Sequence, residues 1–241
     1  DSRRAIELAL KAFVYVQPNT FPMPWGAHPN FQCLCPSDYI KYLNELPNTH
    51  LWTFGDNLSH HTEWRGVHTV PLGFDSFSYQ PPTETTKKYD VCFVGGWANN
   101  GFNEKKQIML KYFREFASSG LNCGFFVNRG LTHNQELAVL HGSRVALNIH
   151  DAYQRILGYD TNERTFKSLG LNGLLVSDKV AQLERIFPEI KTAISPSGAV
   201  RLVKQYLSLS SAEIADIKGK NIQNVLDNHC YTHRVRQLIS M

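Results

Sequence analysis

The sequence lacks a long hydrophobic run and any concentration of basic charge. No stretch approaches the roughly 20 apolar residues that a membrane-spanning helix needs, and the N-terminus has no signal-peptide pattern. The 25 Lys and Arg residues only slightly exceed the 21 Asp and Glu residues, and they form no basic stripe. This balance argues against a nucleic-acid surface and suits a phosphate-bearing small molecule. We expect no transmembrane segment and no nucleic-acid partner.

Cysteine is also scarce. There are five cysteines, an odd number, and Cys92 and Cys123 lie in or beside apolar segments. Reduced thiols in a cytoplasmic compartment are the simplest interpretation. Cys33 and Cys35 have no second Cys pair at a spacing typical of zinc sites, so we expect no metal site.

Several common catalytic motifs are missing. The sequence contains no Walker loop, no His-Glu-x-x-His helix and no Gly-x-Ser-x-Gly elbow. Residues 95–100 read GGWANN, which is not the spaced-glycine fingerprint of dinucleotide-binding domains. A dinucleotide-dependent dehydrogenase is therefore disfavoured.

What is present is an alternation of strand-like and helix-like segments, which predicts an α/β fold with a mainly parallel sheet. The predicted strands lie at 13–16, 51–54, 67–70, 90–94, 123–127, 145–149 and 174–177. The predicted helices lie at 6–12, 37–46, 104–116, 133–141, 165–171, 180–186, 198–207, 211–228 and 231–239.

The polar, proline-containing segment 80–88 is the best linker candidate. It divides the chain into residues 1–85, which hold too few strands for a complete doubly wound domain, and residues 86–241, which suffice for one. We expect the first part to be a reduced or partial domain, the last helix to cross back to it, and the chain to belong to a longer multidomain protein.

In open α/β sheets, ligands bind outside the carboxyl ends of the strands. Two short loops of this chain follow predicted strands and are candidates for such a site. Gly95, Gly96 and Trp97 follow the strand at 90–94, and paired glycines suit either a tight turn or a close approach to phosphate. Asn128 and Arg129 follow the strand at 123–127, where the guanidinium could bind a phosphate, stack on a base or simply face solvent.

The third loop follows the strand at 145–149 and leads into a short helix. It contributes His150 and the helix start Asn162, Glu163, Arg164, Thr165, Phe166 and Lys167. The amino end of a helix favours anions, and Arg164 and Thr165 would add charge-assisted hydrogen bonds to a diphosphate. The alternative is a helix cap with Arg164 paired to Glu163 or Asp160.

Four segments resemble the spore-maturation CgeB-like branch of the glycosyltransferases. They are a strand ending in Gly-Gly (93–96), "ALNIH" (146–150), Arg-Thr-Phe (164–166) followed by a Gly and a strand (173–176), and "HCYTHR" (229–234). Their order and approximate spacing agree over residues 89–236.

The resemblance implies a GT-B architecture, in which two Rossmann-like domains face a cleft, here with a short or truncated N-terminal one. It places the nucleobase of a nucleotide-sugar donor near residues 127–131 and the diphosphate near Gly95, Gly96 and Arg164. It also implies a metal-independent reaction without a bound cofactor, since helix dipole and cationic side chains stabilise the leaving diphosphate. We expect UDP to be the nucleoside diphosphate of the donor, because it is common among such donors.

One position departs from the family pattern. Many relatives carry a Glu after the Phe, whose carboxylate accepts hydrogen bonds from the ribose, whereas this chain has Lys167, which can only donate. Either another group holds the ribose, with Glu163 the nearest carboxylate in sequence, or donor binding is altered or lost.

The predicted function is sugar transfer from a nucleotide diphosphate to a glycan hydroxyl. A transferase that inverts the anomeric centre needs a base, for which Asp56 is our candidate over His28, His60 and His61; the competing interpretation of Asp56 is an Asx turn. Two alternatives remain: a non-catalytic nucleotide- or glycan-binding module, which Lys167 and the short N-terminal part favour, and a nucleotide-sugar epimerase.

Overall fold

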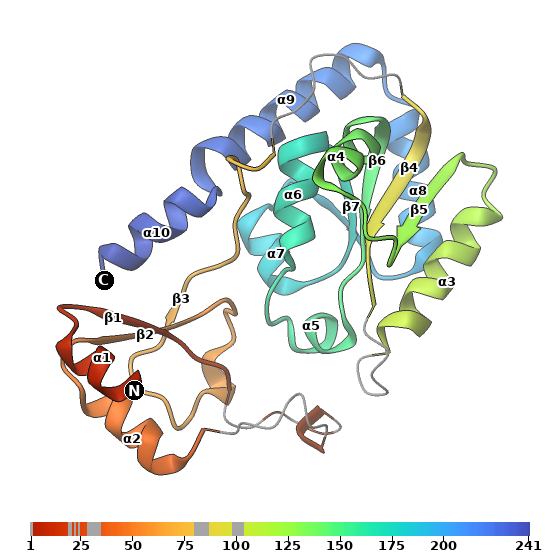
Figure 1. The fold of residues 1–241 in the computed structure, drawn as a ribbon. Coiled ribbons are helices and arrows are strands. Elements are labelled where there is room, and N and C mark those ends of the chain that lie inside the picture. The colour runs from red at the N-terminus through yellow and green to blue at the C-terminus, as the bar shows by residue number, and fades with distance from the viewer. Residues whose placement is uncertain are drawn as a thin grey trace. The chain divides into compact units, whose positions relative to one another are not determined.

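The chain forms two compact α/β units. The computed structural model describes residues 2–18, 21, 23, 25–27, 35–79, 87–97 and 104–241. One unit contains residues 1–71 and 235–241, and the other contains residues 72–234 (Figure 1). Each has a parallel sheet with helices, which confirms the predicted fold class. The linker predicted at 80–88 falls largely outside the described residues.

The first unit is small. Its elements are α1 (Ser2–Leu8), β1 (Ala12–Tyr15), η1 (Trp25–Ala27), α2 (Ser37–Glu45), β2 (Thr49–Thr53), η3 (Leu58–His60) and β3 (His68–Thr69). The three strands pair in parallel in the order β1-β2-β3. Its core gathers around Val16, Ile40, Leu43, Leu51 and Trp64.

The first helix lies earlier in the chain than predicted. We expected it at 6–12, but α1 ends at Leu8 and β1 begins at Ala12. The side-chain amide of Asn48 donates to the backbone carbonyls of Ile6 and Ala9, both at 2.7 Å. These bonds satisfy carbonyls at the helix end, and a residue 39 positions away cannot be read from local periodicity.

The second unit has a five-stranded parallel sheet in the order β5-β4-β6-β7-β8. Its strands are β4 (Tyr89–Gly95), β5 (Cys123–Val127), β6 (Ser143–Asn148), β7 (Leu175–Asp178) and β8 (Lys191–Ala193). Its helices are α3 (Lys105–Ala117), α4 (His133–His141), α5 (Ala152–Leu157), α6 (Glu163–Asn172), α7 (Ala181–Ile186), α8 (Pro196–Leu207) and α9 (Ser211–Asn228), while α10 (Tyr231–Ile239) straddles the boundary of the two units.

Helices cover the sheet of the second unit: α3 packs beside α8, and α6 packs beside α4 and α9 (Figure 1). Val91, Cys92 and Phe93 on β4 are fully buried, as expected for a parallel strand covered on both faces. Burial raises the pKa of the Cys92 thiol to about 11. Cys92, Cys123 and Cys230 are free thiols.

The segment around Cys230, part of the "HCYTHR" motif, pairs with a distant part of the second unit. Phe74 and Cys230 form a parallel bridge, and the amide of Phe74 donates to the carbonyl of His229 at 2.8 Å. Arg234 adds a bond from Nε to the carbonyl of Leu72 at 3.0 Å. A Cβ on Gly73 would lie 3.0 Å from the His229 carbonyl oxygen, so a glycine permits this close approach. The motif thus anchors the start of the unit to its end.

Two elements of the second unit were not predicted. β8 is only three residues long and its Lys191–Ala193 sequence shows no hydrophobic alternation. α5 has six residues and begins with a capping box between Asp151 and Gln154. β8 is too short for a period to be recognised. α5 buries Gln154 while Ile156 is 70% exposed, so no apolar face marks it in the sequence.

None of the helices in the described part of the chain is long and apolar enough to span a bilayer.

Candidate functional site

The sheet of the second unit reverses its direction of growth between β4 and β6. The chain passes from β4 outward to β5, then returns to β6 on the other side of β4 and continues to β7 and β8. Connections that leave neighbouring strands in opposite directions create a crevice at their carboxyl ends, which is where open α/β sheets bind ligands. Gly95 ends β4 and Asn148 ends β6, so two of the sequence-predicted loops meet there.

Arg164 bridges the two strands at this crevice. Its Nε donates to the carbonyl of Val94 at 2.7 Å, and its Nη1 donates to Asn148 Oδ1 at 3.1 Å and to the carbonyl of Ile149 at 3.4 Å. The guanidinium also lies 4.6 Å from the ring centroid of Phe93. Burial lowers the pKa of Arg164, but an arginine remains charged in proteins.

The third nitrogen of the guanidinium faces Gly95. A Cβ at that position would lie only 2.2 Å from Arg164 Nη2, so a larger residue would displace the cation. No described residue accepts a hydrogen bond from Nη2, and the described ion pairs of the chain do not join Arg164 to Glu163 or Asp160. The cation is therefore held by neutral acceptors and keeps donors for an anion.

A buried chain of hydrogen bonds extends from β6 to β7. Asn148 Nδ2 donates to Thr165 Oγ1 at 2.8 Å, and the hydroxyl oxygens of Thr165 and Thr161 lie 2.6 Å apart. The Thr161 hydroxyl lies 2.9 Å from His150 Nε2, and the other ring nitrogen, Nδ1, lies 2.6 Å from Asp178 Oδ1. Because the carboxylate of Asp178 can only accept, His150 is assigned its proton on Nδ1 and donates to Asp178. Nε2 of the neutral ring then accepts from Thr161, and Thr161 accepts in turn from Thr165.

The electrostatics of this chain agree with that assignment. Burial lowers the pKa of His150, which keeps the ring neutral. Burial alone would raise the pKa of Asp178, but the bonds from His150 and the charge of Arg155 outweigh it and hold that pKa below its ordinary value. Arg155 Nε lies 3.2 Å from the second carboxylate oxygen. The side chains of His150 and Asp178 are 0% exposed, so they position β6 and α6 rather than face a ligand.

The amino end of α6 is only partly covered. Asn162 is its N-cap in extended conformation without a side-chain cap, and its Oδ1 has no partner among the described groups. Glu163 is exposed, whereas Thr165 and Phe166 are fully buried. The sequence-predicted residues of this helix thus divide into a buried anchor and an accessible start, and the amino end of a helix favours an anion.

The loops after β4 and β5 line an open cavity of about 210 Å³. Its lining consists of Val94, Gly95, Gly96, Phe126, Asn128, Arg129, Gly130, Leu131 and Glu136. Asn128 has φ 52° and its Oδ1 accepts the amide of Trp97 at 3.2 Å; a Cβ on Gly96 would lie 2.3 Å from that oxygen. Sequence reasoning therefore named residues that the structure brings together, but it missed Glu136.

Lys167 forms an ion pair with the residue that sequence reasoning missed. Its Nζ lies 2.7 Å from Glu136 Oε1, and both side chains are mostly buried. The ammonium is also 5.4 Å from the ring centroid of Tyr79, whose hydroxyl donates to Glu136 Oε2 at 3.0 Å. The only signal for Glu136 in the sequence was an acidic residue in the first turn of a predicted helix, where acidic residues are common for helix-dipole reasons alone.

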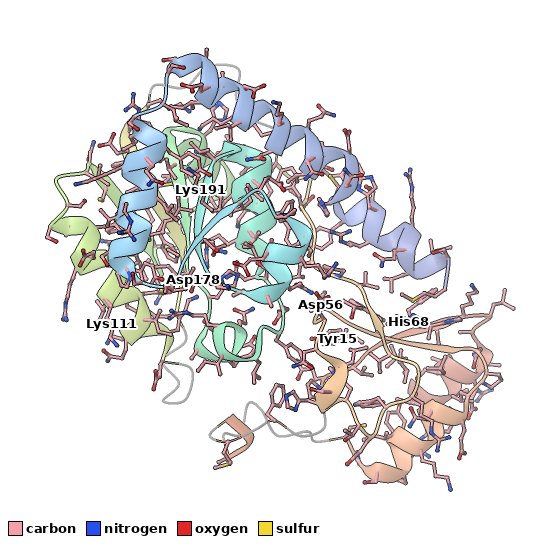
Figure 2. The ribbon with its side chains drawn as sticks, turned by 180° about the vertical axis from the view of Figure 1, so that it is seen from behind. Tyr15, Asp56, His68, Lys111, Asp178 and Lys191 are labelled. Carbon is pink, nitrogen blue, oxygen red and sulfur yellow. The ribbon has the colours of Figure 1, made fainter. Side chains whose placement is uncertain are left out.

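A larger cavity of about 640 Å³ lies elsewhere in the second unit, between α3, α5 and the segments after β7 and β8. It contains none of the sequence-predicted residues. Two of its cations are already paired, Arg155 with Asp178 and Lys179 with Glu184, and the lining also contains Lys111 and Glu104. Figure 2 labels Lys111 and Asp178 on this unit. We favour the smaller cavity as a site because it adjoins the crevice where the sheet reverses.

The candidate base Asp56 lies in the first unit (Figure 2). It follows β2 by three residues and is partly buried. His60 ends the short helix η3, and His61 is buried, which lowers its pKa to about 4. His28 lies outside the described residues. Within the described part of the chain, no three His, Cys, Asp or Glu side chains gather as metal ligands.

Acidification is expected to lower the melting temperature of the protein. Burial lowers the pKa of His61 and of His229 to about 4 each, against 6.5 for an exposed histidine. Between these values the unfolded chain binds protons that the folded chain does not, so the free energy of unfolding falls as the pH drops from about 6.5 to about 4. Burial raises the pKa of Asp160 to about 7, which stabilises the folded chain on acidification, but Asp160 is a single group.

Circular dichroism melts at pH 7.5 and pH 4.8 measure this effect. The His229→Gln variant should lose less stability between the two pH values than wild type does. A melting temperature that rises on acidification would contradict the assignment of these histidines as neutral.

Comparison with known proteins identifies the family of this chain. The family described as "Glycosyl transferase-like" matches residues 90–240, well over half of the chain. The chain belongs to this family. No curated protein sequence matches it.

Solved glycosyltransferases share the fold of this member of the family at low sequence identity. Staphylococcus aureus TarM, a mutant solved with fondaparinux, α-GlcNAc-glycerol and UDP, superposes with a TM-score of 0.62 at 6% identity, over 95% of this chain and 50% of that one. The UDP-forming α,α-trehalose-phosphate synthase of Burkholderia vietnamiensis gives 0.56 at 11%, over 96% and 66%. T4 phage BGT with UDP-glucose gives 0.52 at 12%, over 95% and 73%.

The chain therefore spans about half the length of the TarM structures. At sequence identities this low, the superpositions establish the fold alone. That fold matches the predicted GT-B architecture.

Proposed function

We propose that this chain transfers a sugar from a nucleotide diphosphate, UDP being the expected nucleotide, to a glycan hydroxyl without a metal ion. Within the family, its motif order resembles the CgeB-like branch. Similarity to TarM and T4 phage BGT, which were solved with UDP or UDP-glucose, supports a nucleotide-sugar donor. The alternative of a non-catalytic nucleotide- or glycan-binding module rests on Lys167 and on the small size of the N-terminal part.

The observation that carries the proposal is the position of Arg164. The guanidinium stands where β4 and β6 diverge, beside Gly95, with the partly exposed first turn of α6 next to it. A diphosphate bound there would receive charge-assisted bonds from Arg164 and from helix amides. In the transition state the leaving diphosphate gains negative charge, so a fixed cation at this place lowers the barrier.

The same arrangement supports metal independence. Because Arg164 is bonded to three oxygen atoms of the protein, it is pre-oriented and need not reorganise when the leaving group forms. Three of the described carboxylates that act on Arg164 already have cationic or histidine partners: Asp151 pairs with Lys105, Glu136 with Lys167, and Asp178 with His150 and Arg155.

For the acceptor half-reaction we keep Asp56 as the candidate base. A carboxylate that follows a parallel strand is at the carboxyl edge of its sheet, where ligands bind. Asp56→Asn should leave donor binding unchanged while slowing transfer. The free thiols of Cys92, Cys123 and Cys230 are compatible with the cytoplasm as compartment.

A thermal-shift panel of nucleoside diphosphates and their sugars tests the proposal. A ligand that binds only the folded form at 100 times its Kd adds about 2.7 kcal/mol, which corresponds to a rise of about 5–10 °C in melting temperature for a domain of this size. Adenosine and inorganic phosphate alone are the controls, because neither presents a nucleoside diphosphate. If no diphosphate shifts the transition, the donor site is refuted; binding without turnover on any glycan acceptor would favour the non-catalytic alternative.

A further inference from the structure

Glu136 is a carboxylate held at the wall of the small cavity beside the crevice. It lies in the first turn of α4, and its side chain is 13% exposed. The part of it that remains accessible lines the same cavity as Gly95, Gly96 and Asn128. A nearly buried charge is costly unless it is paired and hydrogen-bonded, so the groups that hold it define what it can do.

Two donors orient this carboxylate, one on each oxygen. Lys167 Nζ lies 2.7 Å from Oε1, and the hydroxyl of Tyr79 lies 3.0 Å from Oε2. The Tyr79 ring is itself fixed, because it stacks on His133 with ring centroids 4.9 Å apart and an interplanar angle of 7°. Burial and the bond to Glu136 raise the pKa of Tyr79, so its hydroxyl keeps its proton and donates.

A carboxylate has about four lone-pair positions, two on each oxygen. Lys167 and Tyr79 occupy one on each oxygen, which leaves one further acceptor position on each. Two acceptors at the spacing of a carboxylate match two hydroxyl donors on adjacent carbons, as in the ribose of a nucleotide. Acidic side chains serve this purpose at the carboxyl edge of other parallel sheets.

We propose that Glu136 accepts hydrogen bonds from the ribose hydroxyls of the donor nucleotide, and that Lys167 and Tyr79 position it. This inference rests on the proposed function and adds a binding residue to it. It also explains Lys167, which stands on α6 where related sequences carry a Glu: the carboxylate comes from the neighbouring helix α4, and the lysine on α6 is its counter-ion. α4 and α6 pack against each other, so one ion pair joins them.

The test compares ribonucleotides with 2′-deoxyribonucleotides. Calorimetry on the full chain measures Kd for UDP, CDP, GDP and ADP and for the 2′-deoxy form of each. A hydroxyl bonded to a charged acceptor is worth about 10- to 100-fold in affinity, so wild type should prefer the ribo form by at least about 10-fold. Glu136→Gln should reduce this preference several-fold or more, because it removes the charge while conserving the shape. A residue with only a structural role would change both affinities equally.

Glu115→Gln is the matched control. Glu115 is exposed on α3, so this variant removes the same charge away from the cavity and should keep the wild-type preference. If Glu163→Gln abolishes the preference and Glu136→Gln does not, the ribose carboxylate is the one on α6 and the inference is wrong. If Glu136→Gln binds no nucleotide, Tyr79→Phe is measured instead, since it removes one bond but keeps the carboxylate; an unchanged preference there overturns the inference.

The two proposals fail in different ways. Wild type that binds none of the eight nucleotides refutes the donor site, and this inference with it. Wild type that binds them without preference for ribose refutes the role of Glu136 alone.

Discussion

Replacing Arg164 with Met is expected to weaken the binding of nucleoside diphosphates by about 100-fold, because it removes a pre-oriented cation from a largely buried anion site. The guanidinium is held by Val94, Asn148 and Ile149 at the divergence of β4 and β6. The methionine keeps most of the aliphatic volume but supplies no donor. Isothermal titration with the tightest nucleotide of the thermal-shift panel measures the change.

Arg144→Met is the matched control for charge. Arg144 lies on β6, its side chain is 50% exposed, and its ion pair with Asp90 is long at 3.9 Å. Removing it should change nucleotide affinity less than about threefold, since exposed pairs contribute little. Arg164→Lys should fall between the two, because a lysine retains the charge but cannot bond several acceptors as a planar fork. Equal affinities of Arg164→Met and Arg144→Met would remove Arg164 from the site.

Asp178→Ala is expected to lower the free energy of unfolding by about 3–5 kcal/mol, because it leaves buried partners of a carboxylate without an acceptor. Asp178 is 0% exposed and binds the Nδ1 of His150 at 2.6 Å, the backbone amide of His150 at about 3 Å and Arg155 at 3.2 Å. With the carboxylate gone, the direction of the hydrogen bonds through Thr161 and Thr165 is no longer determined. Urea denaturation followed by circular dichroism measures the loss.

Asp216→Ala provides the comparison. Asp216 pairs with Lys220 four residues later on α9 at 2.7 Å, and both side chains are more than half exposed. Pairs of this kind contribute about 0.3–0.5 kcal/mol, so the variant should be close to wild type. If Asp178→Ala is no more destabilising than Asp216→Ala, the buried chain of hydrogen bonds contributes nothing to stability.

Local pattern predicted most elements of the second unit. β4 contains the apolar run 91–94, and α8 and α9 carry a helical period with N-terminal serine caps, so each could be recognised from its own residues. β8 was missed because three residues show no period, and α5 was missed because it buries Gln154 and exposes Ile156. The position of α1 was wrong because a side chain from another segment, Asn48, ends it.

The candidate site was foreseeable to the extent that it follows strand ends. Gly95, Asn128 and Arg164 each follow or adjoin a predicted strand or helix start, and the rule for open α/β sheets directs attention to them. The roles within the site were not foreseeable. Thr165 was expected to face a phosphate, and it is 0% exposed and bonded to Asn148. Whether a side chain on a helix faces ligand or core depends on its neighbours in space.

By itself, the sequence determined that this chain is an α/β protein whose phosphate-binding candidates lie after its strands, because hydrophobic period, glycine placement and helix caps act over a few residues. Only the tertiary structure decided which strands are neighbours, that Arg164 spans β4 and β6, and that Lys167 meets Glu136 across two helices. Those contacts join residues up to 70 positions apart. Packing of the sheet and its helices creates them, and no local pattern encodes the partner of a charged side chain.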